Sequence, residues 1–345
     1  MKMNAIMFHA PGDIRYEEVD VPEIEADEVL VRVKTALTCG TDVKTFRRGH
    51  PVLIKTVPSG FGHEFAGIVE QVGENVTSFK RGQKVVAANS APCMQCFYCG
   101  LGEYNLCENL NLLNGAFAEY IKVPAQIVKY NMLEIPEHVS FDEAAFVEPL
   151  ANVLHGAERT EIKAGQTVGV IGLGPIGLMF VKVAKLKGAR VIAMGRNPLK
   201  LKLAKDFAGA DEVIDLTTLV DPVEEIKSLT PGGKGLDIAI EAVGLPALWE
   251  KALKITRRGG TVNLFGGCKS GTTIELDTRR VHYDEIKIIS IFHHTPAHIK
   301  EALNLISDGS INVKKLITAQ MPLSEGIEGI KMHDDGRVIK AALHP

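Results

Sequence analysis

Three glycines in the spacing Gly-x-Gly-x-x-Gly constrain the fold of this 345-residue chain more than any other feature. They follow an apolar run at 166–171 that predicts a buried strand, and they open an apolar segment that predicts a helix ending near Lys187. This order is typical of a dinucleotide-binding βαβ unit, in which a pyrophosphate approaches the glycine backbone at the helix N-terminus. The expected cofactor contacts are Gly172, Gly174, Pro175, Ile176 and Gly177.

Strands and helices continue to alternate after this turn. Apolar runs at 190–194, 237–241 and 261–265 predict further strands, and 198–207 predicts a helix. Repeated strand–helix units imply a parallel, doubly wound sheet. A last helix is expected at 296–307, where a threonine and a proline mark its start and a glycine follows its end.

The first 150 residues have a different pattern. The run 29–34 alternates apolar and polar residues, as a half-buried strand does, and 66–72 and 84–87 predict further short strands. The last 50 residues lose the strand–helix alternation, so they could return into this β-rich part. The length of the chain also favours two domains.

Composition excludes several classes of partner. The net charge is −3 and the sequence pI is about 6.4, so we expect neither nucleic acid nor an anionic membrane as partner. The N-terminus lacks the pattern of a signal peptide, and the longest apolar stretch, 168–181, is too short to span a bilayer. We therefore expect a cytoplasmic protein, in which thiols stay reduced.

Four of the six cysteines lie close together in the spacing C-x2-C-x2-C-x7-C, at Cys93, Cys96, Cys99 and Cys107. Two disulfides would not suit a reducing compartment, and a redox pair would explain only two of the four. Four thiolates can converge on one Zn²⁺, although an iron–sulfur cluster also remains open. Because the protein would supply all four ligands, such a zinc site would be structural.

A second group of chemical residues comes from three separate segments. Cys39, His63 and Glu148 could supply one thiolate, one imidazole and one carboxylate, which can hold Zn²⁺ and leave a position for water or substrate. Each residue alone has an ordinary alternative. Cys39 could be a small buried hydrophobe, His63 a core histidine, and Glu148 a carboxylate at a helix start.

Together and in this order, these motifs resemble the zinc-containing medium-chain dehydrogenases of the zinc alcohol dehydrogenase superfamily, over nearly the full chain. The chain is most similar to the branch of polyol (sorbitol-type) and threonine dehydrogenases, which carry a glutamate at the Glu148 position where ordinary alcohol dehydrogenases carry a cysteine. The matching segments are 39–42, 62–73, the four-cysteine lobe, 115–120, 148–150 and the glycine turn.

The resemblance implies an α/β protein of two domains. Residues 1–152 and 290–345 would form a GroES-like β-rich catalytic domain, with a structural zinc lobe at 92–108. Residues 153–289 would form a Rossmann domain with a doubly wound parallel sheet. The branch is commonly tetrameric, so we expect a homo-oligomer, either a tetramer or a dimer.

The resemblance also implies two zinc ions, one catalytic and one structural. The catalytic ion would be held by Cys39, His63 and one or both of Glu64 and Glu148, and the structural ion by the four clustered cysteines. In the family, the hydroxyl that matches Thr41 passes the substrate proton outward, and a histidine three residues later continues the relay. That position is Lys44 here, which could contact the cofactor or an acidic substrate, or could be a solvated surface lysine.

The preferred cofactor is expected to be NADP(H), with NAD(H) possible. In NAD-dependent Rossmann domains an acidic residue ends the second strand, but that position is Gly195 here. Arg196 and Lys200 follow it and could pair with a 2′-phosphate. The alternative is that Arg196 stacks on adenine while NAD(H) is used.

We therefore expect a zinc-dependent oxidoreductase that transfers a hydride between a small secondary alcohol, polyol or sugar and a nicotinamide cofactor. His293 and His294, expected at the end of the last Rossmann strand, could hydrogen-bond a hydroxylated substrate; otherwise one packs and one is exposed. The alternatives are an L-threonine 3-dehydrogenase, a zinc-free quinone reductase-like enzyme, and a non-enzymatic zinc ribbon, which the acidic balance disfavours.

Overall fold

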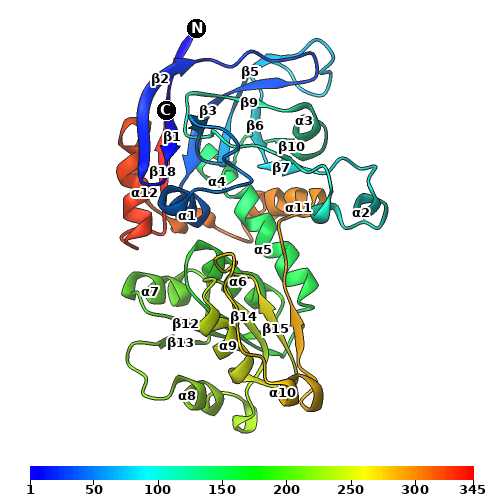
Figure 1. The fold of residues 1–345 in the computed structure, drawn as a ribbon, viewed down its shortest axis with the longest axis vertical. Coiled ribbons are helices and arrows are strands. Elements are labelled where there is room, and N and C mark those ends of the chain that lie inside the picture. The colour runs from blue at the N-terminus through cyan, green and yellow to red at the C-terminus, as the bar shows by residue number, and fades with distance from the viewer. The chain divides into compact units, whose positions relative to one another are not determined.

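The computed structural model describes all 345 residues, which form two compact units. The first unit combines Met1–Ala151 with His294–Pro345, and the second is Asn152–His293 (Figure 1). The chain therefore leaves the first unit, builds the second, and returns. No helix has both the length and the apolar character that crossing a membrane requires.

The main sheet of the first unit has seven strands: β3 (Val29–Leu37), β5 (Glu64–Val72), β6 (Lys84–Ala87), β9 (Tyr120–Val123), β10 (Met132–Glu134), β17 (Ile317–Pro322) and β18 (Lys340–His344). The strand order is β10-β6-β5-β3-β18-β17, and β9 also pairs with β3. Strand β18 pairs antiparallel with β3, Ala342 opposite Leu37 and Leu343 opposite Ala36. The end of the chain therefore lies beside one of its first strands.

Two smaller sheets complete the strands of the first unit: β1 (Lys2–Ala10) with β2 (Asp13–Asp20) and β4 (Ser59–Gly60), and β7 (Ser90–Ala91) with β8 (Asn111–Leu112). Its helices are α1 (Gly40–Arg48), α2 (Phe97–Gly100), α3 (Ala125–Asn131), α4 (Phe141–Ala144), α11 (Pro296–Ser307) and α12 (Gly326–Asp334), and α5 (Val147–Arg159) begins in it. Helix α12 contacts both α1 and β18, so the C-terminal segment His294–Pro345 packs against a helix from the N-terminal part of the same unit.

The second unit has one six-stranded sheet: β11 (Thr167–Ile171), β12 (Arg190–Gly195), β13 (Glu212–Asp215), β14 (Leu236–Glu241), β15 (Thr256–Leu264) and β16 (Lys287–Ile289). The strand order is β13-β12-β11-β14-β15-β16, and every pairing is parallel. The order reverses at β11, which is where a doubly wound sheet binds its ligand. The predicted parallel, doubly wound sheet is confirmed.

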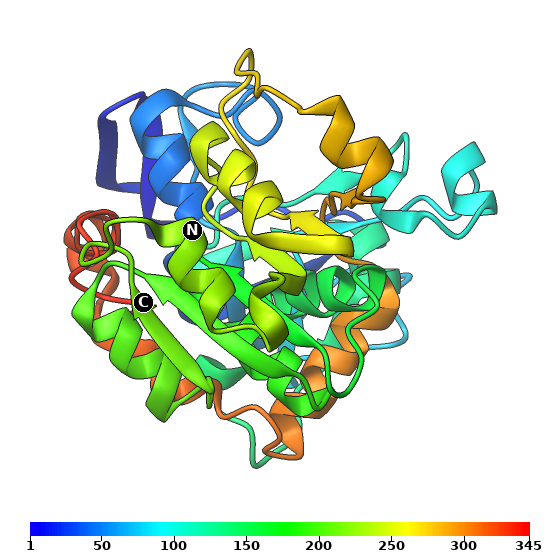
Figure 2. The ribbon, with the colours of Figure 1, turned by 90° about the horizontal axis from the view of Figure 1, so that it is seen from below.

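Helices flank this sheet (Figure 2). They are α6 (Pro175–Leu186), α7 (Pro198–Asp206), α8 (Pro222–Ser228), α9 (Pro246–Ile255) and α10 (Thr278–Tyr283). Helices α6 and α7 contact each other and strands β11 to β13, whereas α9 contacts α8 and strands β14 and β15. Helices thus cover the sheet, and the central strands β11, β12 and β14 are buried along nearly their whole length.

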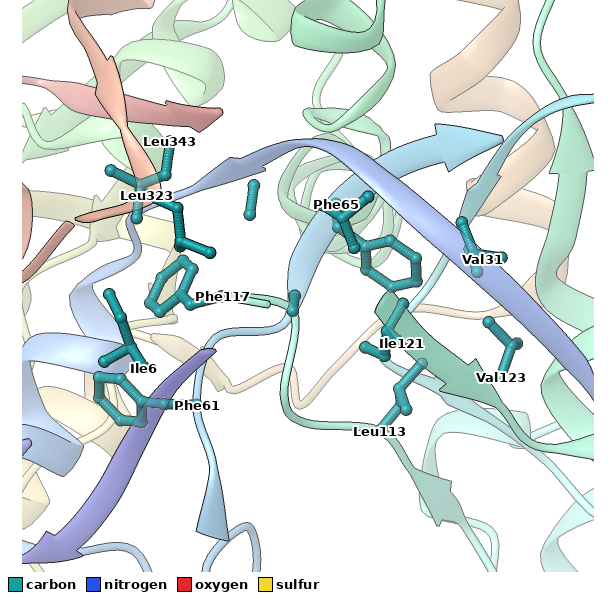
Figure 3. Packing of buried hydrophobic residues seen from close by; sticks show 14 of the residues in the cluster. Ile6, Val31, Phe61, Phe65, Leu113, Phe117, Ile121, Val123, Leu323 and Leu343 are labelled. Atoms are coloured by element: carbon teal, nitrogen blue, oxygen red, sulfur yellow. The ribbon is translucent and has the colours of Figure 1, made fainter. Parts of the chain in front are cut away.

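The core of the first unit combines many aliphatic side chains with a few buried phenylalanines. Ile6, Phe61 and Phe117 lie close together (Figure 3), and the rings of Phe61 and Phe117 meet edge to face with their centroids 5.7 Å apart. Each ring is 1% exposed or less. Burying a side chain of this kind contributes about 1.5–3 kcal/mol, so this cluster holds the β-rich unit together.

Two strands differ from the sequence expectation. Strand β15 begins at Thr256 and not at residue 261, because the polar start of the strand pairs with β14 at Leu236. The last strand of the second unit, β16, ends at Ile289, so His293 and His294 do not lie at its end. His293 has a φ of 65°, a left-handed conformation that no strand residue adopts.

Candidate active site

Strand pairing in the first unit brings Cys39, His63 and Glu64 together. Glu64 begins β5 and pairs with Leu37 at the end of β3, two residues before Cys39. The candidate ligand atoms of Cys39, His63 and Glu64 lie within 4.8 Å of one another. A thiolate, an imidazole and a carboxylate form a donor set that fits Zn²⁺ and leaves a coordination position open.

A glycine fixes the approach of His63. Gly62 has a φ of 85°, and a Cβ atom on it would meet the Phe117 ring at 2.6 Å. Only glycine suits this combination of left-handed backbone and close packing. Because Gly62 has no side chain, the Phe117 ring can pack directly against the backbone of the residue that precedes His63.

Asp42 orients two of the three residues. Cys39 is the N-cap of α1, and its backbone N–H donates to Asp42 Oδ2 at 2.8 Å. The other oxygen, Oδ1, lies 3.0 Å from Nδ1 of His63. A carboxylate on one ring nitrogen leaves the other nitrogen for a metal. Burial opposes the charge of His63, but Asp42 and Cys39 raise its pKa well above the ordinary value.

Glu64 is fully buried and its two oxygens have different surroundings. Oε2 is paired with the ammonium of Lys340, which is also buried. Oε1 has no hydrogen-bond partner. A buried carboxylate oxygen without a partner is costly, so a cation beside Oε1 would satisfy the group. The residues present thus fit a metal ion.

Glu148 does not join this group. It lies in the first turn of α5 and is buried. Its Oε1 lies 3.9 Å from Nε2 of His294, which is 3.1 Å from Asn89 Oδ1. Of the two carboxylates that the sequence offers as ligands, the structure brings only Glu64 to Cys39 and His63.

The remaining predicted residues of the first unit lie on α1. Thr41 is half-buried, and its backbone N–H points to the Cys39 sulfur at 3.5 Å. Lys44 is exposed on the same helix. The sequence analysis did not predict Lys340, which pairs with Glu64. A single lysine within the apolar run 338–343 could have indicated a buried charge that needs a partner.

The four-cysteine lobe forms a second cluster in the first unit. The sulfur atoms of all four cysteines lie within 4.8 Å of one another, and those of Cys96 and Cys107 are 3.9 Å apart. Four thiolates about 2.3 Å from one tetrahedral Zn²⁺ would lie about 3.8 Å apart. Burial raises the pKa of Cys107, and the N–H groups that Cys93 and Asn109 donate to its sulfur oppose this effect. Hydrogen bonds, above all that from the backbone N–H of Gln95, lower the pKa of Cys93 to about 6.

The glycine turn of the second unit has the shape of a phosphate cradle. Gly172 has a φ of 94°, and a Cβ atom on Gly177 would meet the Gly172 carbonyl oxygen at 1.8 Å. Gly174, the N-cap of α6, has open space where a Cβ would be and no side chain that caps the helix. The first turn of α6 therefore offers the unpaired N–H groups of Ile176 and Gly177 to an anion, because Pro175 has no N–H.

The end of β12 carries the predicted specificity residues. Gly195 is the last residue of the strand, and Arg196 follows it and is exposed. Lys200, in the first turn of α7, is half-buried, and burial lowers its pKa. No carboxylate lies at the Gly195 position itself. Asp215 of β13 pairs with Gly195 in the sheet, and its carboxylate accepts the backbone N–H of Thr217.

Comparison with known proteins identifies the family. Residues 25–136 match the alcohol dehydrogenase GroES-like domain, and residues 175–308 match the zinc-binding dehydrogenase domain. A sorbitol dehydrogenase of Bacillus subtilis (strain 168) is 36% identical over 332 residues, which cover 94% of this chain and 91% of the relative. The chain belongs to the zinc-binding alcohol dehydrogenase family.

Two more relatives of this dehydrogenase are informative. An L-threonine 3-dehydrogenase of Bacillus subtilis (strain 168) is 37% identical over 336 residues, covering 95% of this chain and 94% of the relative. A protein from Sinorhizobium meliloti 1021, solved with bound NADP, superposes with a TM-score of 0.91 at 31% identity over the whole of both chains. The resemblance to the polyol and threonine branch, with its GroES-like and Rossmann folds, is confirmed.

Proposed function

We propose that this dehydrogenase oxidises a secondary alcohol, polyol or sugar with transfer of a hydride to a nicotinamide cofactor, or runs the reverse reaction. The observation that carries this proposal is the cluster of Cys39, His63 and Glu64, in which a buried carboxylate oxygen lacks a partner. Zn²⁺ bound there would act as a Lewis acid for the negative charge that develops on the substrate oxygen.

The side chains around this cluster have separate roles in the proposal. Cys39, His63 and Glu64 hold the metal, and Asp42 fixes the ring of His63. The half-buried hydroxyl of Thr41, two residues after Cys39, accepts the proton of the substrate hydroxyl and gives its own proton to solvent. Glu148 lies beside His294 and outside the ligand group. In the proposal it hydrogen-bonds polar groups of the substrate or binds the metal only transiently.

We propose a second, structural zinc in the four-cysteine lobe. The 3.9 Å separation between the sulfur atoms of Cys96 and Cys107 supports it, because tetrahedral thiolates around one ion lie at about this spacing. The family branch supports a homo-oligomer in the cytoplasm, which chromatography with light scattering and cell fractionation would test.

NADP(H) is the proposed cofactor. Gly195 has no side chain that could accept a hydrogen bond from a ribose 2′-hydroxyl, and Arg196 can pair with a 2′-phosphate through its planar fork. Lys200 follows in the first turn of α7. The NADP found in the Sinorhizobium meliloti relative agrees with this assignment. Use of NAD(H) is the alternative.

L-Threonine is the second candidate substrate, because a threonine dehydrogenase matches this chain as closely as a sorbitol dehydrogenase does. A panel of polyols, sugars and L-threonine, assayed with NADP⁺ and NAD⁺, distinguishes the candidates. Metal analysis of the same preparation should find two zinc ions per chain. Zinc in the lobe alone, with turnover of quinones only, would contradict the proposal.

A further inference from the structure

Lys340 is an unusual residue for a strand in the middle of a sheet. It begins β18, its side chain is 1% exposed, and the three residues after it are buried and apolar. Its ammonium pairs with Oε2 of Glu64, donates to the carbonyl of Thr38 at 2.9 Å, and lies 5.6 Å from the ring centroid of Phe146. A buried lysine charge is costly, so these contacts must compensate it.

The two polar partners of Lys340 flank the candidate metal ligands. Thr38 directly precedes Cys39, and Glu64 directly follows His63. The position of β18 is itself fixed to this segment, because the N–H of Ala341 donates to Thr38 Oγ1 at 3.0 Å. One ammonium group therefore connects the two strands, β3 and β5, that lead to the ligands.

Stability alone does not account for a lysine here. An apolar side chain in place of a buried ion pair is often neutral or stabilising. A cation next to a metal site also repels the metal. The ammonium of Lys340 contacts Glu64 Oε2 and the carbonyl of Thr38, and both of these groups lie next to the candidate ligands in the sequence. The lysine must therefore act on Glu64 in a way that an apolar residue could not.

We propose that Lys340 is a positioning residue that restricts Glu64 to a single donor oxygen at the metal. This inference rests on the proposed zinc site. A carboxylate can bind a metal through one oxygen or through both. Lys340 holds Oε2, and only Oε1 is left without a partner. With Glu64 so restricted, one coordination position stays open for the substrate hydroxyl.

The test measures the metal and not turnover. Metal-free enzyme is loaded with Co²⁺, and the spectrum of the Cys39 site is obtained by subtracting that of a His63→Ala variant. In Lys340→Met we expect weaker ligand-field bands, because Glu64 then binds through both oxygens and the coordination number rises. We also expect chelators to remove this metal about tenfold more slowly, equivalent to about 1.4 kcal/mol. The lobe metal should be released at the wild-type rate.

Two variants show whether the effect belongs to the contact with Glu64. Lys340→Arg keeps a buried donor and should restore the wild-type spectrum and release rate. Lys84→Met is a matched control, because Lys84 donates to the carbonyls of Glu137 and Val139 and lies 5.4 Å from the ring of Phe141, but touches no ligand. It should leave the metal unchanged.

The outcomes separate the possibilities. If Lys340→Met is less stable but has the wild-type spectrum and release rate, the lysine is merely structural and the inference is wrong. If the single variant does not fold, the double variant Lys340→Met with Glu64→Gln removes the unpaired charge and is measured in its place. Metal release slower than in the wild type, in the absence of the carboxylate, would also overturn the inference. If the wild-type enzyme binds metal only in the lobe, the proposed function fails first, and this inference with it.

Discussion

The carboxylate of Asp42 lies 3.0 Å from Nδ1 of His63, and both side chains are almost completely buried. The same carboxylate accepts the backbone N–H of Cys39, so one side chain orients the first two candidate ligands. Helix α1 provides this arrangement, because its capping residue and its third residue are Cys39 and Asp42. The helix cap is thus part of the candidate metal site.

Asp42→Asn is expected to weaken metal binding at the Cys39 site by about 10–100-fold, the usual cost of losing a carboxylate behind a ligating histidine. An amide can still cap the helix, so the fold should be retained. Zinc content after dialysis against graded chelator measures the effect. Asp13→Asn, which removes an exposed pair with Arg15, is the control. Equal zinc retention in the two variants would contradict the role of Asp42.

The four-cysteine lobe is expected to be structural. Cys96→Ser should lower the zinc content by about one ion per chain and lower the Tm, because a missing thiolate opens the tetrahedral site. Any protein that stays folded should keep its turnover number. The measurements are metal analysis, calorimetry and steady-state kinetics on one preparation. A variant with both zinc ions and full stability would refute the structural zinc.

The Cys39 site is expected to be catalytic. Cys39→Ala and His63→Ala should each lower kcat by at least about 1,000-fold, since a metal supplies several kcal/mol to the developing charge. The lobe should stay loaded with zinc. Glu148→Ala should lower activity without loss of metal, because Glu148 lies with His294 and apart from the ligands. Normal kcat in a variant shown to lack this metal would exclude the mechanism.

Thr41 is expected to take the substrate proton first. Thr41→Val keeps the shape of the side chain but removes the hydroxyl, so kcat should fall by roughly 100-fold, as for other lost proton acceptors. Thr41→Ser should retain most of the activity. Kinetics across the pH range measure both variants. Near-normal turnover of Thr41→Val at every pH would mean that the proton leaves by another route.

Features that depend on the spacing of neighbouring residues can be predicted from the sequence. Features that depend on the pairing of strands far apart in the chain cannot. The glycine turn and the helix from Pro175 follow from neighbouring residues, so they were predictable. The choice of Glu64 over Glu148 depends on the pairing of β5 with β3. Lys340 is 276 positions away from Glu64, and only the return of β18 to β3 brings them together.

Cofactor preference is the last prediction, and it rests on the end of β12. The kcat/KM with NADP⁺ should exceed that with NAD⁺ by at least about tenfold, or about 1.4 kcal/mol. Arg196→Leu should remove most of this preference, because a phosphate would lose its bidentate partner. If NAD⁺ were used as well as NADP⁺ by the native enzyme, the assignment would be wrong, and Arg196 would instead stack on the adenine.

Reversal of the preference requires a new acceptor for the ribose hydroxyl as well as the loss of Arg196. Gly195→Asp supplies it, but a Cβ atom at Gly195 would lie 2.9 Å from the side chain of Leu173. Gly195→Ala introduces the same Cβ without a carboxylate, so it measures the cost of this contact alone. The double variant Gly195→Asp with Arg196→Leu should prefer NAD⁺, whereas Gly195→Ala with Arg196→Leu should not. If both double variants behaved alike, the carboxylate at this strand end would not decide which cofactor binds.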